Sequence, residues 1–187
     1  MRIFQSLLIA LFWAEASIVS AQYPDPQTLV VLKSYRSAEY AIPGGVIDLA
    51  IAVEIKKGWH VNSNRPLADN LIATKVDIEK SKQFTIVETV YPPHVVKRFK
   101  FADKPLAVFE GKLLIGIRLK MAGKLRDDTV KVAGTLLYQA CNDEVCLLPA
   151  QKDFEISIPV SGKARSKALH GEIFSQIKFS KRTTAQK

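Results

Sequence analysis

The feature that most constrains the fold is a strict alternation of apolar and polar or small residues along two stretches of the chain. In the first, Ile47, Leu49, Ile51 and Val53 alternate with Asp48, Ala50, Ala52 and Glu54. In the second, Leu113, Ile115, Ile117 and Leu119 alternate with Lys112, Gly116, Arg118 and Lys120. A period of two puts alternate side chains on opposite faces of an extended strand. Both stretches are therefore predicted to be half-buried β-strands.

Further strand-like segments follow along the chain, separated by turn signals such as Pro43-Gly44-Gly45. They comprise residues 28–35, 74–78, 84–91, 130–138 and 154–158. Seven to nine short strands, with no alternation of strands and helices, predict an all-β sandwich or barrel. After Ser161 the pattern changes, because Leu169, Ile173 and Ile177 have helical spacing. Residues 161–187 are therefore predicted to form a basic C-terminal tail with a short helix.

The N-terminus has the pattern of a secretory signal peptide. Arg2 precedes a mostly apolar segment, residues 3–19, and Val19-Ser20-Ala21 fits the small-x-small rule for cleavage. The alternative is an uncleaved membrane anchor, but the apolar segment is short and Glu15 interrupts it. We therefore expect residues 1–21 to be removed, residues 22–160 to form one domain, and the protein to be periplasmic, where disulfides persist.

The charge of the chain is strongly positive, with 27 Lys and Arg residues against 18 Asp and Glu residues and a net charge of +9. The basic residues are dispersed, and no nucleic-acid-binding motif accompanies them. The excess is interpreted as a solvated surface, with an attraction to anionic membrane or an acidic partner. Nucleic acid is not predicted as a partner.

Cys141 and Cys146 are the only cysteines of the chain and are separated by four residues. One interpretation is a structural clip, but a loop this short contributes only about 2 kcal/mol in the chain-entropy model. The other is a redox-active dithiol, although the spacing is not the thioredoxin-type C-x-x-C. Asp143 and Glu144 lie between the cysteines, where their charge would raise the pKa of the first thiol, or would have little effect if both point into solvent.

Three motifs favour the redox interpretation through a family resemblance. Gly58-Trp59-His60-Val61-Asn62, Phe109-Glu110-Gly111, and Tyr138-Gln139-Ala140-Cys141 through Cys146-Leu147-Leu148-Pro149 resemble the N-terminal periplasmic domain of the bacterial thiol:disulfide interchange protein DsbD. The resemblance extends over about residues 28–160 and implies an immunoglobulin-like sandwich. It implies that Cys146 forms the mixed disulfide with a partner and that Cys141 resolves it.

The same resemblance implies the partners. Electrons would come from a membrane-embedded donor and pass to thioredoxin-fold periplasmic oxidoreductases, such as disulfide isomerases or cytochrome c maturation thioredoxins. Because the sequence contains neither a membrane domain nor a thioredoxin domain, we expect a free-standing, monomeric version that uses no cofactor. The alternative function is a secreted, non-catalytic interaction module with a structural disulfide.

The remaining site residues are also assigned through the resemblance. Residues 100–104 fall where the family has a cap loop, so Phe101, with Asp103 beside it, is the candidate shield of the disulfide; a shift of register would favour Phe99. The alternative is that Phe101 is a core residue. Tyr138 is expected to pack near the disulfide. Trp59 is interpreted as core, and a soft-metal site of His60 with both cysteines is only a weak alternative, so no metal is predicted.

Overall fold

The structure is a computed structural model and describes residues 23–162 and 165–180. Within these residues the chain forms eleven β-strands, a 3-10 turn (η1, Pro26–Thr28) and a single helical turn (α1, Gly171–Phe174). The predicted signal peptide, residues 1–21, lies outside the described part. No helix in the described part is long and apolar enough to cross a bilayer.

The strands form three antiparallel sheets. The first has the order β1-β2-β8-β5 and comprises β1 (Val30–Arg36), β2 (Val46–Ile55), β8 (Lys112–Met121) and β5 (Phe84–Val90). The second has the order β10-β3-β7-β6 and comprises β10 (Ala140–Cys141), β3 (His60–Asn62), β7 (Leu106–Glu110) and β6 (Val95–Lys97). The third has the order β11-β9-β4 and comprises β11 (Ala150–Pro159), β9 (Thr129–Tyr138) and β4 (Lys75–Ile78).

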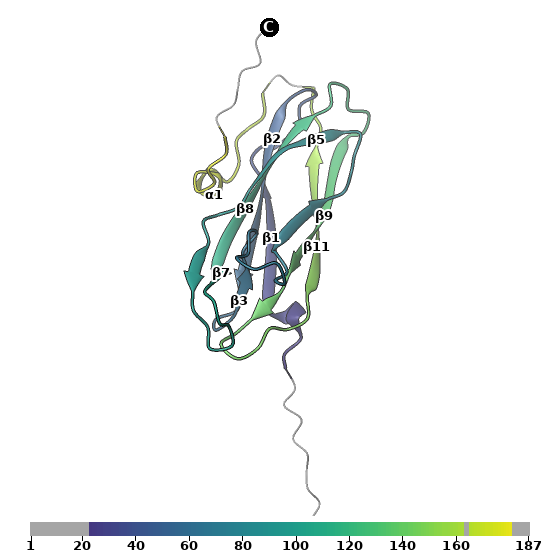
Figure 1. The fold of residues 1–187 in the computed structure, drawn as a ribbon. Coiled ribbons are helices and arrows are strands. Elements are labelled where there is room, and N and C mark those ends of the chain that lie inside the picture. Colours follow the sequence, from purple (N-terminus) through teal and green to yellow (C-terminus); the bar gives the residue numbers. More distant parts are fainter. Residues whose placement is uncertain (1–22, 163–164, 181–187) are drawn as a thin grey trace, which may run out of the picture.

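This architecture confirms the predicted all-β, immunoglobulin-like sandwich (Figure 1). The prediction of seven to nine strands was too low. It missed the short strands of the second sheet, including β6. Basic side chains are tolerated there because β6 is an edge strand with one open side.

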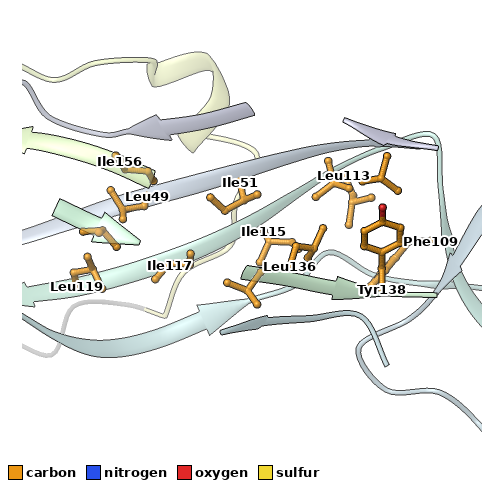
Figure 2. Packing of buried hydrophobic residues seen from close by; sticks show 14 of the residues in the cluster. Leu49, Ile51, Phe109, Leu113, Ile115, Ile117, Leu119, Leu136, Tyr138 and Ile156 are labelled. Atoms are coloured by element: carbon orange, nitrogen blue, oxygen red, sulfur yellow. The ribbon is translucent and has the colours of Figure 1, made fainter. Parts of the chain in front are cut away.

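The core lies between the first and third sheets. Figure 2 shows its aliphatic side chains interdigitating, and they come from β2, β8, β9 and β11: Leu49, Ile51, Ile115, Ile117, Leu119, Leu136 and Ile156. Each fully buried side chain of this kind stabilises the fold by about 1.5–3 kcal/mol. The inward-facing residues of β2 and β8 are those identified by the alternating pattern, so the predicted inner face is confirmed.

The outer face of the first sheet is more buried than predicted, because a C-terminal strap, residues 166–180, lies on it. The strap first runs beside residues 37–40, where the Leu169 amide donates to the Ser37 carbonyl over 2.9 Å. It then forms α1, which Figure 1 shows outside the sandwich near β2 and β8. A Cβ atom at Gly116 would lie 2.5 Å from Ile177 and 2.7 Å from Phe179, so the glycine allows this close approach. The predicted C-terminal helix is confirmed as a single turn.

A charge cluster lies beneath the end of the strap. Arg118 of β8 makes a bidentate contact with Asp48 of β2, at 2.7 and 3.0 Å, and donates to Glu88 of β5 at 2.9 Å. The centre of the Phe179 ring lies 4.4 Å from the Arg118 guanidinium, and the guanidinium donates a hydrogen bond to the Ser180 carbonyl. The polar positions of the alternating pattern are thus buried here together with their ionic partners.

Candidate functional site

Cys141 and Cys146 form a disulfide within a hairpin that extends from strands β9 and β11. The two residues are paired directly across the hairpin, with their Cα atoms 4.0 Å apart. The Leu147 amide donates to Ala140, and the Asn142 amide donates to Val145, each over 2.9 Å. Main-chain hydrogen bonds therefore hold the hairpin on both sides of the sulfur atoms.

The tip of the hairpin is shaped by Asn142. Its side-chain oxygen accepts hydrogen bonds from the amides of Glu144 and Val145, at 2.9 and 2.8 Å. This is an Asx turn, which orders a tight reversal without a glycine. Asp143 and Glu144 occupy the exposed tip, so both carboxylates are in contact with solvent.

The two sulfur-bearing residues differ in their exposure. Cys141 is completely buried, whereas Cys146 is only partly buried. Leu148, two residues after Cys146, is 82% exposed. Solvent therefore reaches residue Cys146 but not Cys141.

The chain changes sheets at Gln139, just before the disulfide. Up to Tyr138, β9 pairs with β11; beyond it, β10 pairs with β3. The Gln139 side chain donates to the Leu147 carbonyl at 3.1 Å and accepts from Asn62 at 3.2 Å. Sequence reasoning gave no role to Gln139 or Asn62, although both are polar residues within the motifs that carried the resemblance.

Four side chains lie in one row across the second sheet and its hairpin. Cys146 pairs with Cys141, Cys141 pairs with His60, and His60 pairs with Glu110. Residues directly opposite one another in antiparallel strands have their side chains on the same face, with Cβ atoms about 4.5–5.5 Å apart. Lys97 forms an ion pair with Glu110 at the far end of the row.

His60 is only 2% exposed, and its Nε2 atom has no hydrogen-bond partner among the described residues. Burial lowers the pKa of His60 below its usual 6.5, while the charges of Glu110 and Asp143 act in the opposite direction and Lys97 reinforces the lowering. The imidazole is therefore neutral at pH 7. The negative charge of Asp143, whose predicted target was a thiol, thus acts to raise the pKa of His60.

The predicted cap loop follows β6 and carries two stacked phenylalanines. The Phe99 ring stacks on His60 with a centroid separation of 4.1 Å, and Phe101 stacks on Phe99 at 5.7 Å. Phe101 is 38% exposed, so it is not a core residue. Phe99, the residue that the alternative register favoured, thus contacts His60, and His60 pairs with Cys141. Asp103 is exposed in the same loop.

Tyr138 and Trp59 lie around the site rather than in the row. Tyr138 is completely buried, and its hydroxyl donates to the Pro26 carbonyl at 2.9 Å, which fastens the N-terminal segment to the core. Burial raises the pKa of Tyr138 to about 12, so it stays protonated. Trp59 is half-buried and packs against the core cluster.

A cleft of about 580 Å³ lies beside the row; its lining includes Trp59, His60, Lys97, Phe99, Glu110 and Asp143. Within residues 23–162 and 165–180, no three His, Cys, Asp or Glu side chains are grouped as a metal site. The disulfide lies at the edge of the small second sheet, because Cys141 belongs to its edge strand β10.

Comparison with known families explains this arrangement. The family model of the N-terminal region of thiol:disulfide interchange protein DsbD matches residues 17–158. The chain belongs to this family. The family match confirms the resemblance drawn from the motifs, and the chain is a thiol:disulfide interchange domain with its disulfide between Cys141 and Cys146. The C-terminal strap lies beyond the residues that the DsbD N-terminal family model matches.

Among solved structures, the chain is similar to the N-terminal periplasmic domain of ScsB from Proteus mirabilis, with 14% sequence identity and a TM-score of 0.47. The alignment covers 74% of this chain and 49% of the ScsB chain. The present chain therefore spans about half the length of that structure. A comparison with curated proteins found no match.

Proposed function

We propose that the domain relays reducing equivalents in the periplasm by reversible exchange of the Cys141–Cys146 disulfide. It would receive electrons from a membrane-embedded donor and pass them, as a monomer, to thioredoxin-fold oxidoreductases of the disulfide isomerase or cytochrome c maturation type. The observation that carries the proposal is the difference in burial between the two cysteines, because exchange requires one accessible sulfur and one protected resolving sulfur.

The proposed transfer to a partner has two steps. The Cys146 thiolate attacks the partner disulfide, which forms the mixed disulfide and releases one partner sulfur as a thiolate. Cys141 then attacks the Cys146 sulfur, which closes the domain disulfide and releases the second partner sulfur. The domain loses two electrons and two protons, and the partner disulfide gains them as two thiols. Asp143 and Glu144 lie exposed at the hairpin tip, which is the case in which their charge has little effect on the first thiol.

Leu148 supplies a contact surface for the partner in this proposal. It is 82% exposed and follows Cys146 by two residues, where a docking thioredoxin-fold protein would cover it. Leu148→Ser should therefore slow exchange with a thioredoxin-fold protein several-fold while leaving exchange with glutathione unchanged. Equal slowing in both reactions would mean that Leu148 shapes the hairpin rather than the docking surface.

Export and localisation form part of the proposal. The solved structure with a similar fold is described as a periplasmic domain, and the present chain begins with a predicted signal peptide, residues 1–21. Mass spectrometry of the protein recovered from cells would test this, with a mature N-terminus at Gln22 as the expected result.

Titration of the disulfide against glutathione redox buffers tests the central claim. A relay pair should equilibrate at a moderately negative potential, whereas a structural disulfide has a potential below roughly −300 mV and resists reduction. A disulfide that stays closed throughout the glutathione range would favour the alternative, a non-catalytic interaction module with a structural clip.

A further inference from the structure

His60 has a buried nitrogen whose hydrogen bond is not made in the disulfide form. Its side chain is 2% exposed, and Nε2 has no partner among the residues that the structure describes. A buried polar atom without a hydrogen-bond partner destabilises the folded state, so such atoms are rare in folded proteins. The position of this atom therefore requires an explanation.

The neighbour of His60 in the row is Cys141, which is directly opposite it in the pairing of β3 with β10. A disulfide sulfur carries no hydrogen and cannot donate to a nitrogen. A thiol does carry one, and the neutral imidazole is an acceptor at its unprotonated nitrogen. In the tautomer that carries its hydrogen on Nδ1, Nε2 is the acceptor, and reduction of the disulfide would then create a hydrogen-bond donor at the residue paired with His60.

The surroundings of His60 keep this acceptor available. The Phe99 ring stacks on the imidazole at 4.1 Å and fixes its plane. The charged groups that act on it are Glu110 on β7, Asp143 on the hairpin tip and Lys97 on β6. Glu110 is itself paired with Lys97, whose positive charge offsets the stabilisation of the imidazolium by the Glu110 carboxylate. Desolvation is the largest influence, and it favours the neutral ring.

We propose that His60 is the proton acceptor of Cys141 in the dithiol form: its Nε2 binds the Cys141 thiol hydrogen and takes the proton when Cys141 resolves the mixed disulfide. This rests on the relay function proposed above. In the resolving step the Cys141 sulfur bonds to the Cys146 sulfur as the bond from Cys146 to the partner sulfur breaks. The electron pair leaves with the partner sulfur, which is protonated from solvent, and the imidazolium returns its proton to solvent.

A hydrogen bond between the Cys141 thiol and His60 would change the measured equilibrium between dithiol and disulfide. A hydrogen bond made only in the dithiol form stabilises that form, so removing it shifts the equilibrium toward the disulfide. A neutral hydrogen bond of ordinary strength corresponds to a shift of roughly two- to tenfold. The bond requires the neutral imidazole, so the shift is present above the His60 pKa, which lies below 6.5, and disappears as the pH falls through it.

The experiment measures the equilibrium constant with glutathione from pH 5 to pH 8, by acid quenching and alkylation of free thiols, for the full chain and three variants. His60→Phe should favour the disulfide by two- to tenfold at pH 7.5, with the difference narrowing toward pH 5. His60→Gln retains an acceptor and should recover part of the effect. His94→Phe, at an exposed histidine, is the matched control and should behave as wild type.

An NMR titration of the wild-type histidines provides a second measurement that does not depend on how the variants fold. The midpoint of His60 should fall on reduction, because a thiol donor stabilises its neutral form. An unchanged midpoint, or a His60→Phe shift that does not vary with pH, would overturn the inference. A wild-type protein that does not equilibrate with glutathione would refute the relay function itself. A wild-type protein that equilibrates normally, with no effect of His60→Phe, would refute only the role of His60.

Discussion

The two four-stranded sheets differ in the length of their strands and in what they bury. The sheet β1-β2-β8-β5 has strands of seven to ten residues, and its two central strands are covered by the core on one side and largely by the C-terminal strap on the other. The sheet β10-β3-β7-β6 has strands of two to five residues and carries the disulfide at its edge. Each sheet has a buried nitrogen without a hydrogen-bond partner among the described residues, Nε of Arg36 in the first and Nε2 of His60 in the second, but only His60 pairs with a cysteine of the disulfide.

From this difference we expect the free energy of unfolding to depend mainly on the first sheet and disulfide exchange to depend on the second. Long strands with two covered faces tolerate little change, because each buried side chain contributes to folding. Short strands at an edge contribute less to folding and can hold reactive groups in positions that are not optimal for stability. Changes in one sheet should then leave the property of the other sheet nearly unchanged.

The largest expected effect is the loss of exchange in the second sheet without loss of the fold. Cys146→Ser should abolish transfer to a thioredoxin-fold disulfide, because the accessible sulfur is gone, whereas Cys141→Ser should trap a mixed disulfide that non-reducing electrophoresis detects. Trapping by Cys146→Ser alone would reverse the two roles. Efficient transfer by both single variants would refute the mechanism.

A substitution in the first sheet should have the opposite effect. Arg118→Ala removes the partner of Asp48 and Glu88 beneath the strap, and breaking a buried ion pair typically costs about 3–5 kcal/mol. Urea unfolding should show this loss while the reduction potential stays at the wild-type value. The matched control is Lys112→Ala on the same strand, whose ion pair with Glu54 is exposed and should contribute less than about 1 kcal/mol. A changed potential in Arg118→Ala would show that the two sheets are coupled.

Removal of both sulfurs should have a smaller effect on stability. In Cys141→Ala/Cys146→Ala, the hairpin keeps its main-chain hydrogen bonds and its Gln139 contacts, so the cost is limited to about 2 kcal/mol of loop entropy. Circular dichroism should retain its β-type spectrum and a cooperative melting transition. A double variant that is unfolded at room temperature would instead assign the disulfide a structural role.

The smallest expected effect concerns the stacked rings of the cap loop. Phe99→Ala should speed reduction by dithiothreitol roughly two- to tenfold, because a stacked aromatic pair contributes about 0.5–1.5 kcal/mol and its loss opens the row to solvent. Phe101→Ala should have a weaker effect of the same sign, because Phe101 rests on Phe99. If only Phe101→Ala speeds reduction, Phe101 is the shield that the resemblance first indicated. If the melting temperature falls steeply while the rate of disulfide reduction is unchanged, the two rings stabilise the fold and do not shield the disulfide.

The difference in strand length between the two sheets also explains which strands could be predicted from the sequence. The long strands β2 and β8 were predicted because ten residues are enough for a period of two to be recognised. The strands β3 and β10 have three and two residues, which is too short for any period. In β7, Leu106 to Phe109 are all buried, so the segment shows no alternation. The fold class was therefore predictable, whereas the sheet around the site was not.

The site was predictable only as far as its chemistry lies in adjacent residues. The cysteine pair and the carboxylates between it are local in sequence. The pairing of His60 with Cys141 joins distant strands, and the choice of Phe99 over Phe101 depends on how one loop folds. The position of the strap depends in turn on space left by Gly116, far from Ile177 and Phe179 in the chain.

The strap also has a consequence for the order of assembly. Residues 166–180 follow every strand in the chain, so they are the last of the described segments to be synthesised. The pair of Arg118 and Asp48 needs no residue of the strap, whereas Phe179 and Ser180 cover Arg118. A chain truncated after Pro159 would contain the residues of all eleven strands but would leave this charge pair open to water.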